Sequence, residues 1–142
     1  MKFLVLAAFL CTLVAATTAQ YATKPPVVYQ MQNALGGVLR IVYDLSSDNK
    51  QLIINPNNEQ IISGALLSLD DLYNIFPTFG ASNRSALPMT TSARLSSAFN
   101  NFQNAISGWE TALDQRNPDN LASTFKAVEN AFLDLAGIVV AL

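Results

Sequence analysis

The stretch LSSAFNNFQNAISGWETALDQRNPDNLASTFKAVENAFLDL, residues 95–135, decides the fold. Large apolar residues recur in it at alternating steps of three and four, which is the spacing of one face of an α-helix. With its continuation to the end of the chain, the stretch contains two apolar stripes, one of Leu95, Phe99, Phe102, Ile106, Trp109 and Leu113, the other of Leu121, Phe125, Val128, Phe132, Leu135, Val139 and Leu142. It therefore predicts two amphipathic helices.

A signal for the start of a helix separates these two stripes. Asn117 is a preferred N-cap residue, and Pro118 suits the first position of a helix. A helix is therefore expected to begin there, which leaves only residues 115–116 to connect it to the helix before. So short a connection predicts an antiparallel helical hairpin.

The first half of the chain carries the same kinds of signal. Pro25 and Pro26 can open one helix, while Asn55 and Pro56 are expected to open the next, which stops at Pro77. The apolar stripe of the first helix comprises Val28, Met31, Leu35, Val38, Val42 and Leu45. That of the second comprises Ile62, Leu66, Leu69, Tyr73 and Phe76, and it is widened by Ile61, Ala65 and Leu72. Both stripes again have helical spacing.

These four stripes predict an all-α protein, folded as an antiparallel four-helix bundle. The expected connections are residues 46–54, 77–89 and 115–116, and Thr90, Thr91 and Ser92 are the expected N-caps of the third helix. The third connection forces its helices into a hairpin, whereas the second is long enough either to cross the bundle or to join neighbouring helices.

The two halves also resemble each other in sequence. QNALGG at residues 32–37 is echoed by QNAISG at residues 103–108, and NPNN at residues 55–58 is echoed by NPDN at residues 117–120. The echo predicts two duplicated helical hairpins. Chance similarity between two helices of simple composition is the alternative explanation.

Gly37 and Gly108 occupy matching places in this echo, inside predicted helices. Glycine within a helix costs about 1 kcal/mol relative to alanine, so a compensating role is expected. Close packing of two helix backbones is the favoured role at both positions. Room for a ligand beside Val38 and Trp109 is the alternative.

The N-terminus has the features of a secretory signal peptide. Lys2 gives a basic start, an apolar run follows, and small residues lead to a cleavage site between Ala19 and Gln20. Residues 1–19 are thus the expected signal peptide, and residues 20–142 form one secreted, extracellular domain with no stable membrane anchor. The only cysteine, Cys11, lies in the leader, so the mature chain is expected to be free of cysteine.

Composition argues against most catalytic chemistry. The chain has no histidine, and its only cysteine lies in the leader, so the mature chain has no histidine or cysteine ligand for a metal. It also lacks the histidine that is the usual base of a serine hydrolase. No phosphate-binding loop or nucleophile elbow is present, and the basic residues are scattered singly. We therefore expect no enzyme, no catalytic residue, no metal site, no cofactor and no nucleic-acid partner.

The predicted second hairpin is rich in aromatic residues that share its interior face: Phe99, Phe102, Trp109, Phe125 and Phe132. Rings of this size fill a helical core well, which is the favoured interpretation. Two alternatives remain open. The rings could line a cavity for an apolar ligand, or the bundle could open and present its apolar stripes to a surface.

One modification site is expected. Asn83 begins the triplet Asn-Arg-Ser, which is an N-glycosylation acceptor in a secreted chain, so the protein is expected to be a glycoprotein.

These features favour a secreted, non-enzymatic binding protein that carries or adsorbs to an apolar ligand or surface. A helical effector that recognises an extracellular protein or receptor is one alternative, and a structural component of an extracellular matrix or fibre is another. The sequence does not distinguish the partner or the oligomeric state.

Overall fold

The computed structural model describes residues 24–142, and the secondary structure within that range is helical throughout. The elements are α2 (Pro26–Ile54), α3 (Glu59–Ile75), the 3-10 helix η1 (Phe76–Phe79), α4 (Ala81–Arg84), α5 (Met89–Gln115) and α6 (Pro118–Val140). Four of them are long, as the apolar stripes predict. The expected signal peptide, residues 1–19, and the Ala19–Gln20 cleavage site lie outside the described residues.

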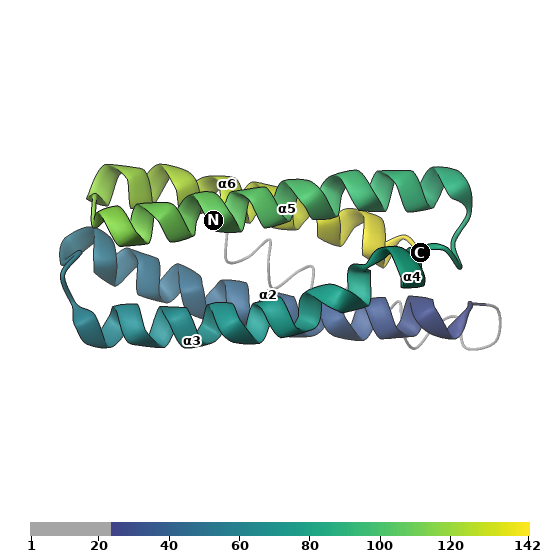
Figure 1. Cartoon of the computed structure of the whole chain (residues 1–142), viewed down its shortest axis with the longest axis horizontal. Helices are drawn as coiled ribbons and strands as arrows, with labels where there is room; N and C mark the ends of the chain where they lie inside the picture. The colour runs from purple at the N-terminus through teal and green to yellow at the C-terminus, as the bar shows by residue number, and fades with distance from the viewer. Residues whose placement is uncertain (1–23) are drawn as a thin grey trace.

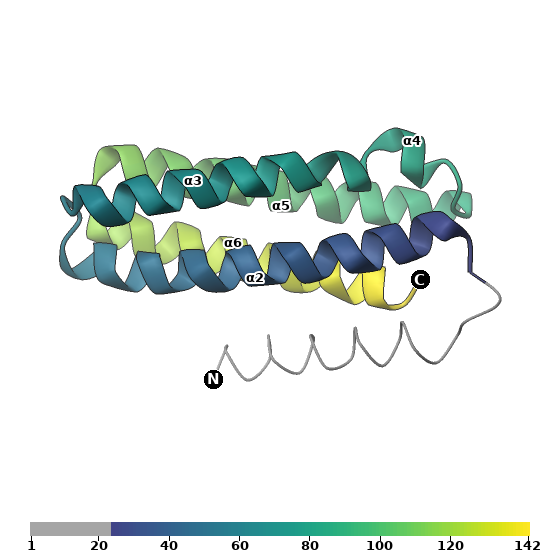
Figure 2. The ribbon, with the colours of Figure 1, turned by 90° about the horizontal axis from the view of Figure 1, so that it is seen from below.

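The four long helices lie side by side along the long axis of the molecule (Figures 1 and 2). Helix α2 packs closely against both α3 and α6, and α5 packs closely against α6. The backbones of α3 and α5 make few close approaches to each other. Elements η1 and α4 join the end of α3 to the start of α5 and contact each other and α5.

The prediction that residues 46–54 form a connection is wrong, because α2 continues through Ile54. Its buried face extends past Leu45 to Asn49 and Leu52, again at steps of four and three. The polar side chain of Asn49 interrupts the apolar pattern, although this side chain is buried with the rest of the stripe. A stripe that allows one buried polar residue would have predicted the longer helix.

The start of the second long helix also differs from the prediction. Asn55 is the C-cap of α2, where its N–H donates to the Gln51 carbonyl, and Pro56 lies between the helices. The N-cap of α3 is Asn58, whose Oδ1 accepts from the Ile61 N–H at 3.3 Å. Because α2 continues to Ile54, Asn55 ends this helix instead of opening the next one.

The predicted start of the last helix is confirmed. The Asn117 side chain accepts from the N–H groups of Asp119 at 3.0 Å and Asn120 at 3.2 Å, and Pro118 is the first residue of α6. These two bonds satisfy amide donors that a helix leaves unpaired at its N-terminus. Arg116, which precedes Asn117 and is the C-cap of α5, has a left-handed φ of 53° at the turn between α5 and α6.

The predicted caps of α5 are wrong. This helix begins at Met89, and its N-cap is Pro88, which makes no side-chain capping bond. Thr90, Thr91 and Ser92 lie inside the helix. A proline has its φ restricted near the value found here, −53°, and its extended ψ of 143° places it just before the first helical turn.

The apolar stripes of α2 and α5 are buried throughout, as predicted, and that of α6 is buried as far as Val139, with Leu142 partly buried. The prediction for α3 is wrong at two positions. Leu66 is 43% exposed and Tyr73 is 40% exposed, whereas Ala65 and Leu72, which widen the predicted stripe, are fully buried. Helix α3 is therefore rotated so that a smaller residue faces the core, and two large side chains lie at its edge.

Candidate functional site

All five aromatic residues predicted to share an interior face are buried in the core, and none is more than 6% exposed. Four of them form two pairs across α5 and α6: the ring centroids of Phe102 and Phe132 are 6.0 Å apart, and those of Trp109 and Phe125 are 5.4 Å apart. The Trp109–Phe125 pair is edge-to-face, an arrangement that stabilises aromatic packing. We call these five residues, Phe99, Phe102, Trp109, Phe125 and Phe132, the aromatic interior.

Element η1 extends the aromatic interior toward α3. The Phe76 ring lies edge-on to Phe99 and Phe102, with centroid distances of 5.2 and 5.9 Å. Phe79 is fully buried, and its ring centroid is 5.7 Å from that of Phe99. Phe76 and Phe79, which lie on either side of Pro77, thus anchor this connection in the core.

A buried hydrogen bond fixes the indole within this interior. Trp109 Nε1 donates to Asn49 Oδ1 at 2.8 Å, and both side chains are buried. The bond links α5 to the part of α2 that was expected to be a connection. It satisfies the one polar group of the indole, so the ring can be buried without an unpaired donor.

A second buried polar side chain lies nearer the start of α2. Gln32 is fully buried, and its Nε2 donates to the Val139 carbonyl of α6 at 3.3 Å. Its Oε1 has no hydrogen-bond partner among the described residues. The amide is therefore only half satisfied in the core.

Helices α3 and α5 meet through long side chains, along a line that we call the α3–α5 seam. We define it by Glu59 and Tyr73 of α3, Phe76 of η1, Glu110 of α5 and Arg116, the C-cap of α5. The Tyr73 hydroxyl donates to Glu110 Oε2 at 2.7 Å. Arg116 Nη1 donates to Glu59 Oε1 at 2.6 Å and forms an exposed ion pair with it. Half-exposed Leu66 lies on α3 between the positions of these two contacts.

The two polar contacts of the seam shift the ionisation of their members. Burial, followed by the hydrogen bond to Glu110, raises the pKa of Tyr73 to about 12. The hydrogen bond from Arg116 lowers the pKa of Glu59. At neutral pH the Tyr73 hydroxyl is therefore protonated and able to donate, and Glu59 is charged. Glu110 accepts the Tyr73 hydrogen bond across the seam, so this carboxylate helps to join α3 and α5.

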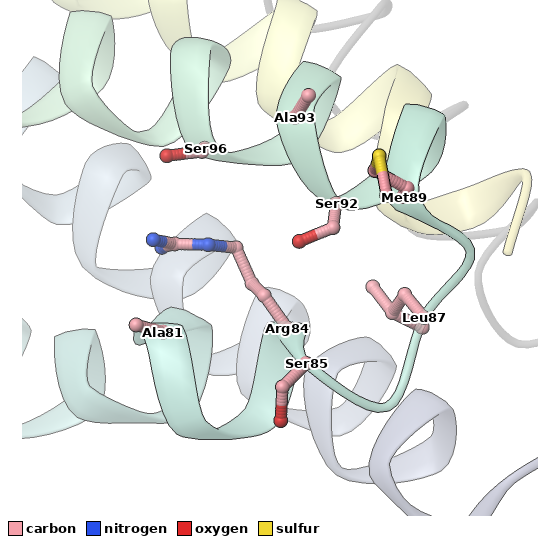
Figure 3. Close-up of a pocket in the computed structure, with 8 residues that line it drawn as sticks. All are labelled: Ala81, Arg84, Ser85, Leu87, Met89, Ser92, Ala93 and Ser96. Carbon is pink, nitrogen blue, oxygen red and sulfur yellow. The ribbon is translucent and has the colours of Figure 1, made fainter.

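A depression of about 620 Å³ lies between α4 and the first turns of α5 (Figure 3). Its lining combines one cation, three hydroxyls and four apolar side chains: Arg84, Ser85, Ser92, Ser96, Ala81, Leu87, Met89 and Ala93. The aromatic interior takes no part in this lining. No sequence pattern pointed to this depression, because α4 falls in a segment whose glycine and prolines predict an irregular connection.

Arg84 supplies the charge of this depression. Its Nη1 donates to the Phe79 carbonyl at 2.6 Å, and within residues 24–142 it forms no ion pair with a carboxylate. Figure 3 shows the guanidinium lying across the space between α4 and α5, below Ser96.

The predicted close packing at the two matching glycines is not found at Gly108. A Cβ added there would meet no atom of another element within 4 Å, so no neighbouring helix requires glycine at this position. A Cβ at Gly37 would lie 3.1 Å from Ile75 Cδ1. That contact is with the end of a flexible side chain of α3, so even at Gly37 it is not a contact between two helix backbones.

The predicted glycosylation site, Asn83, lies on α4 and is half-buried. Its Nδ2 donates to the Thr78 carbonyl at 2.9 Å. A glycan would be attached through this same nitrogen, beside the depression that Arg84 and Ser85 line.

Among residues 24–142, no three His, Cys, Asp or Glu side chains are grouped closely enough to hold a metal ion. Nor is any helix in this range both long enough and apolar enough to cross a membrane. Comparison with known proteins finds no matching family model, no similar curated protein and no similar solved structure.

Proposed function

We propose that this chain is a secreted, non-enzymatic binding protein that carries or adsorbs to an apolar ligand or surface. In this proposal residues 1–19 direct secretion, Asn83 carries a glycan, and the aromatic interior supplies the apolar contacts. The observation that carries the proposal is the α3–α5 seam, where side chains rather than closely packed backbones join the two helices.

We infer that the four long helices form an antiparallel bundle in which each helix neighbours the next along the chain. The close packing of α2 with α3, of α5 with α6 and of α2 with α6 supports this order, because the α3–α5 seam then closes the ring of four helices. Duplication of two hairpins is the finer part of the inference. The different roles of Asn55, which ends α2, and Asn117, which caps α6, weigh against a strict repeat.

Parting of the seam would give an apolar ligand its entry route. The polar contacts to be broken are the Tyr73–Glu110 hydrogen bond and the Glu59–Arg116 ion pair, both of which lie at exposed positions. Exposed polar contacts contribute little to stability, because solvent competes for both partners. Behind them, Phe76 leads directly to Phe99 and Phe102 of the aromatic interior, so a small separation would expose a large apolar area.

A covalent bridge across the seam tests this route. The double variant Tyr73→Cys/Glu110→Cys has the only two thiols of the mature chain, because Cys11 belongs to the expected signal peptide. Binding of the neutral fluorescent probe Nile red is measured before and after the thiols are joined by a short bis-maleimide. We expect the bridge to weaken binding by at least about tenfold, equivalent to 1.4 kcal/mol.

The matched control places the same bridge where no opening is proposed. Asn120 Nδ2 donates to Gln115 Oε1 at 3.0 Å across the α5–α6 turn, so Gln115→Cys/Asn120→Cys is a comparable exposed pair. Bridging it is expected to leave Nile red binding unchanged. Equal binding with and without the seam bridge would refute the entry route, and failure of the unmodified protein to bind the probe would refute the carrier function itself.

A further inference from the structure

The depression between α4 and α5 presents a cation with unused hydrogen-bonding capacity. A guanidinium carries five N–H donors, and Arg84 uses Nη1 to donate to the Phe79 carbonyl. Within the described part of the chain no carboxylate neutralises it. The remaining donors form the planar fork that binds two oxygens of one carboxylate or phosphate at once.

Polar and apolar groups are separated along this depression. The side chains of Ser92 and Ser96 lie on the α5 side of Arg84, and neither hydroxyl is hydrogen-bonded to another of residues 24–142 (Figure 3). Leu87 and Met89 lie at the other end, and Met89 is 87% exposed. A charged, hydroxyl-lined part next to an apolar part suits a molecule with a small anionic head and a hydrocarbon chain.

The depression is also joined to the aromatic interior through Phe79. The carbonyl of this residue accepts the hydrogen bond from Arg84, while its buried ring packs against Phe99. Phe79 would therefore lie between a head group held at Arg84 and the aromatic interior, which supplies the apolar contacts in the proposed function.

We propose that Arg84 binds the anionic head of an amphiphile in this depression, with a long-chain carboxylate as the ligand. Ser92 and Ser96 complete the hydrogen bonding of the head, and Leu87 and Met89 contact the first part of the chain. This inference rests on the proposed function and narrows its ligand from any apolar molecule to an anionic amphiphile.

Two ligands of equal chain length, dodecanoate and dodecanol, separate the charge from the hydrocarbon. Their affinities for the full mature protein and its Arg84→Gln variant are measured by displacement of Nile red. We expect Arg84→Gln to weaken dodecanoate binding by about tenfold, the value of one charge-assisted contact at a partly exposed site, and to leave dodecanol binding unchanged. The variant keeps the Asn-X-Ser triplet, so glycosylation at Asn83 is not altered.

The matched control is Arg94→Gln, which removes an exposed cation from α5, the helix that carries Ser92 and Ser96, without touching the lining of the depression. It is expected to change neither affinity. Arg84→Lys, which keeps the charge, is expected to retain more dodecanoate binding than Arg84→Gln, and circular dichroism reports whether each variant is folded. The inference is wrong if Arg84→Gln leaves dodecanoate binding intact or weakens both ligands equally. The carrier function is a separate matter, because it fails if the unmodified protein binds neither Nile red nor these ligands.

An anionic head can also be offered by a lipid surface. Cosedimentation with phosphatidylcholine vesicles, with and without phosphatidylglycerol, distinguishes this source from a free fatty acid. We expect Arg84 to act on the free carboxylate, so vesicle binding should be the same in the unmodified protein and in Arg84→Gln. Arg84-dependent binding to the anionic vesicles alone would overturn the choice of a free carboxylate.

Discussion

Two buried amides of α2 illustrate how a single polar side chain is accommodated in an apolar core. Asn49 accepts the indole N–H of Trp109, whereas Gln32 donates to Val139 and leaves its Oε1 without a partner among the described residues. An unpaired buried acceptor costs about 1–3 kcal/mol, so the second arrangement is the less favourable one. Neither amide interrupts the helix that carries it.

Asn49→Ala should destabilise the protein because it leaves the Trp109 N–H unpaired in the core. We expect the free energy of unfolding, measured by urea denaturation, to fall by about 2 kcal/mol. The same substitution is also made in Trp109→Phe, which lacks the indole donor. In that variant Asn49→Ala should lower the free energy of unfolding by clearly less. Equal costs in the two backgrounds would show that the hydrogen bond itself does not stabilise the fold.

The long helices differ in how far their sequence patterns reveal them. Helix α6 could be predicted well, because its cap and its stripe are both local features of the chain. The end of α2 was missed by a purely apolar pattern, because its last turns carry Asn49 on the buried face, where the side chain is paired with Trp109 of α5. The rotation of α3 is similar, since its exposed Leu66 and Tyr73 and its buried Ala65 and Leu72 all fit a helical pattern.

Gly37 and Gly108, the two matching glycines of the sequence echo, provide a test at the same scale. Gly108→Ala should raise the free energy of unfolding by about 1 kcal/mol, because alanine is the better helix former and the added Cβ meets no other element within 4 Å. Gly37→Ala should raise it less, since Ile75 Cδ1 lies 3.1 Å from the new atom and must move. Thermal or urea unfolding of both variants checks this order. A loss of stability in Gly108→Ala would mean that the glycine serves a role other than space.

In the molecule as a whole, the polar contacts that hold the α3–α5 seam are weak, and the aromatic interior lies directly behind them. The helices that meet there come from the two predicted hairpins, so the seam joins the two halves of the chain. Its polar contacts depend on one protonated phenol and one charged carboxylate. Stability should therefore change where these groups titrate.

Alkaline pH should weaken the fold through Tyr73. Its pKa in the folded protein is about 12, above the ordinary value of 10.0, so the protonated phenol favours the folded state. This stabilisation is complete below about pH 10 and is lost as the pH rises toward 12. Urea unfolding at a series of pH values should show a steeper loss in the unmodified protein than in Tyr73→Phe. Identical slopes would show that Tyr73 does not contribute.

The opposite end of the pH scale involves Glu59. Arg116 lowers the pKa of Glu59, so the contribution of this carboxylate to the stability of the fold is present at neutral pH. That contribution is lost as the pH falls and Glu59 becomes protonated. The pair is exposed, so the effect is small and should disappear at high salt concentration.

The order of apolar and polar residues along the chain is enough to predict four amphipathic helices, their buried faces on three of them, and the cap at Asn117, because each depends on neighbours within a few residues. Tertiary structure alone decides which helices pack closely, which face of α3 is buried, and where Arg84 lies relative to α5. The physical reason is that these outcomes depend on contacts between residues far apart in the chain: the Asn49–Trp109 bond, the Phe76 and Phe79 rings on Phe99, and the side chains that bridge α3 and α5. No local pattern encodes them, because each is favourable only when its distant partner is in place.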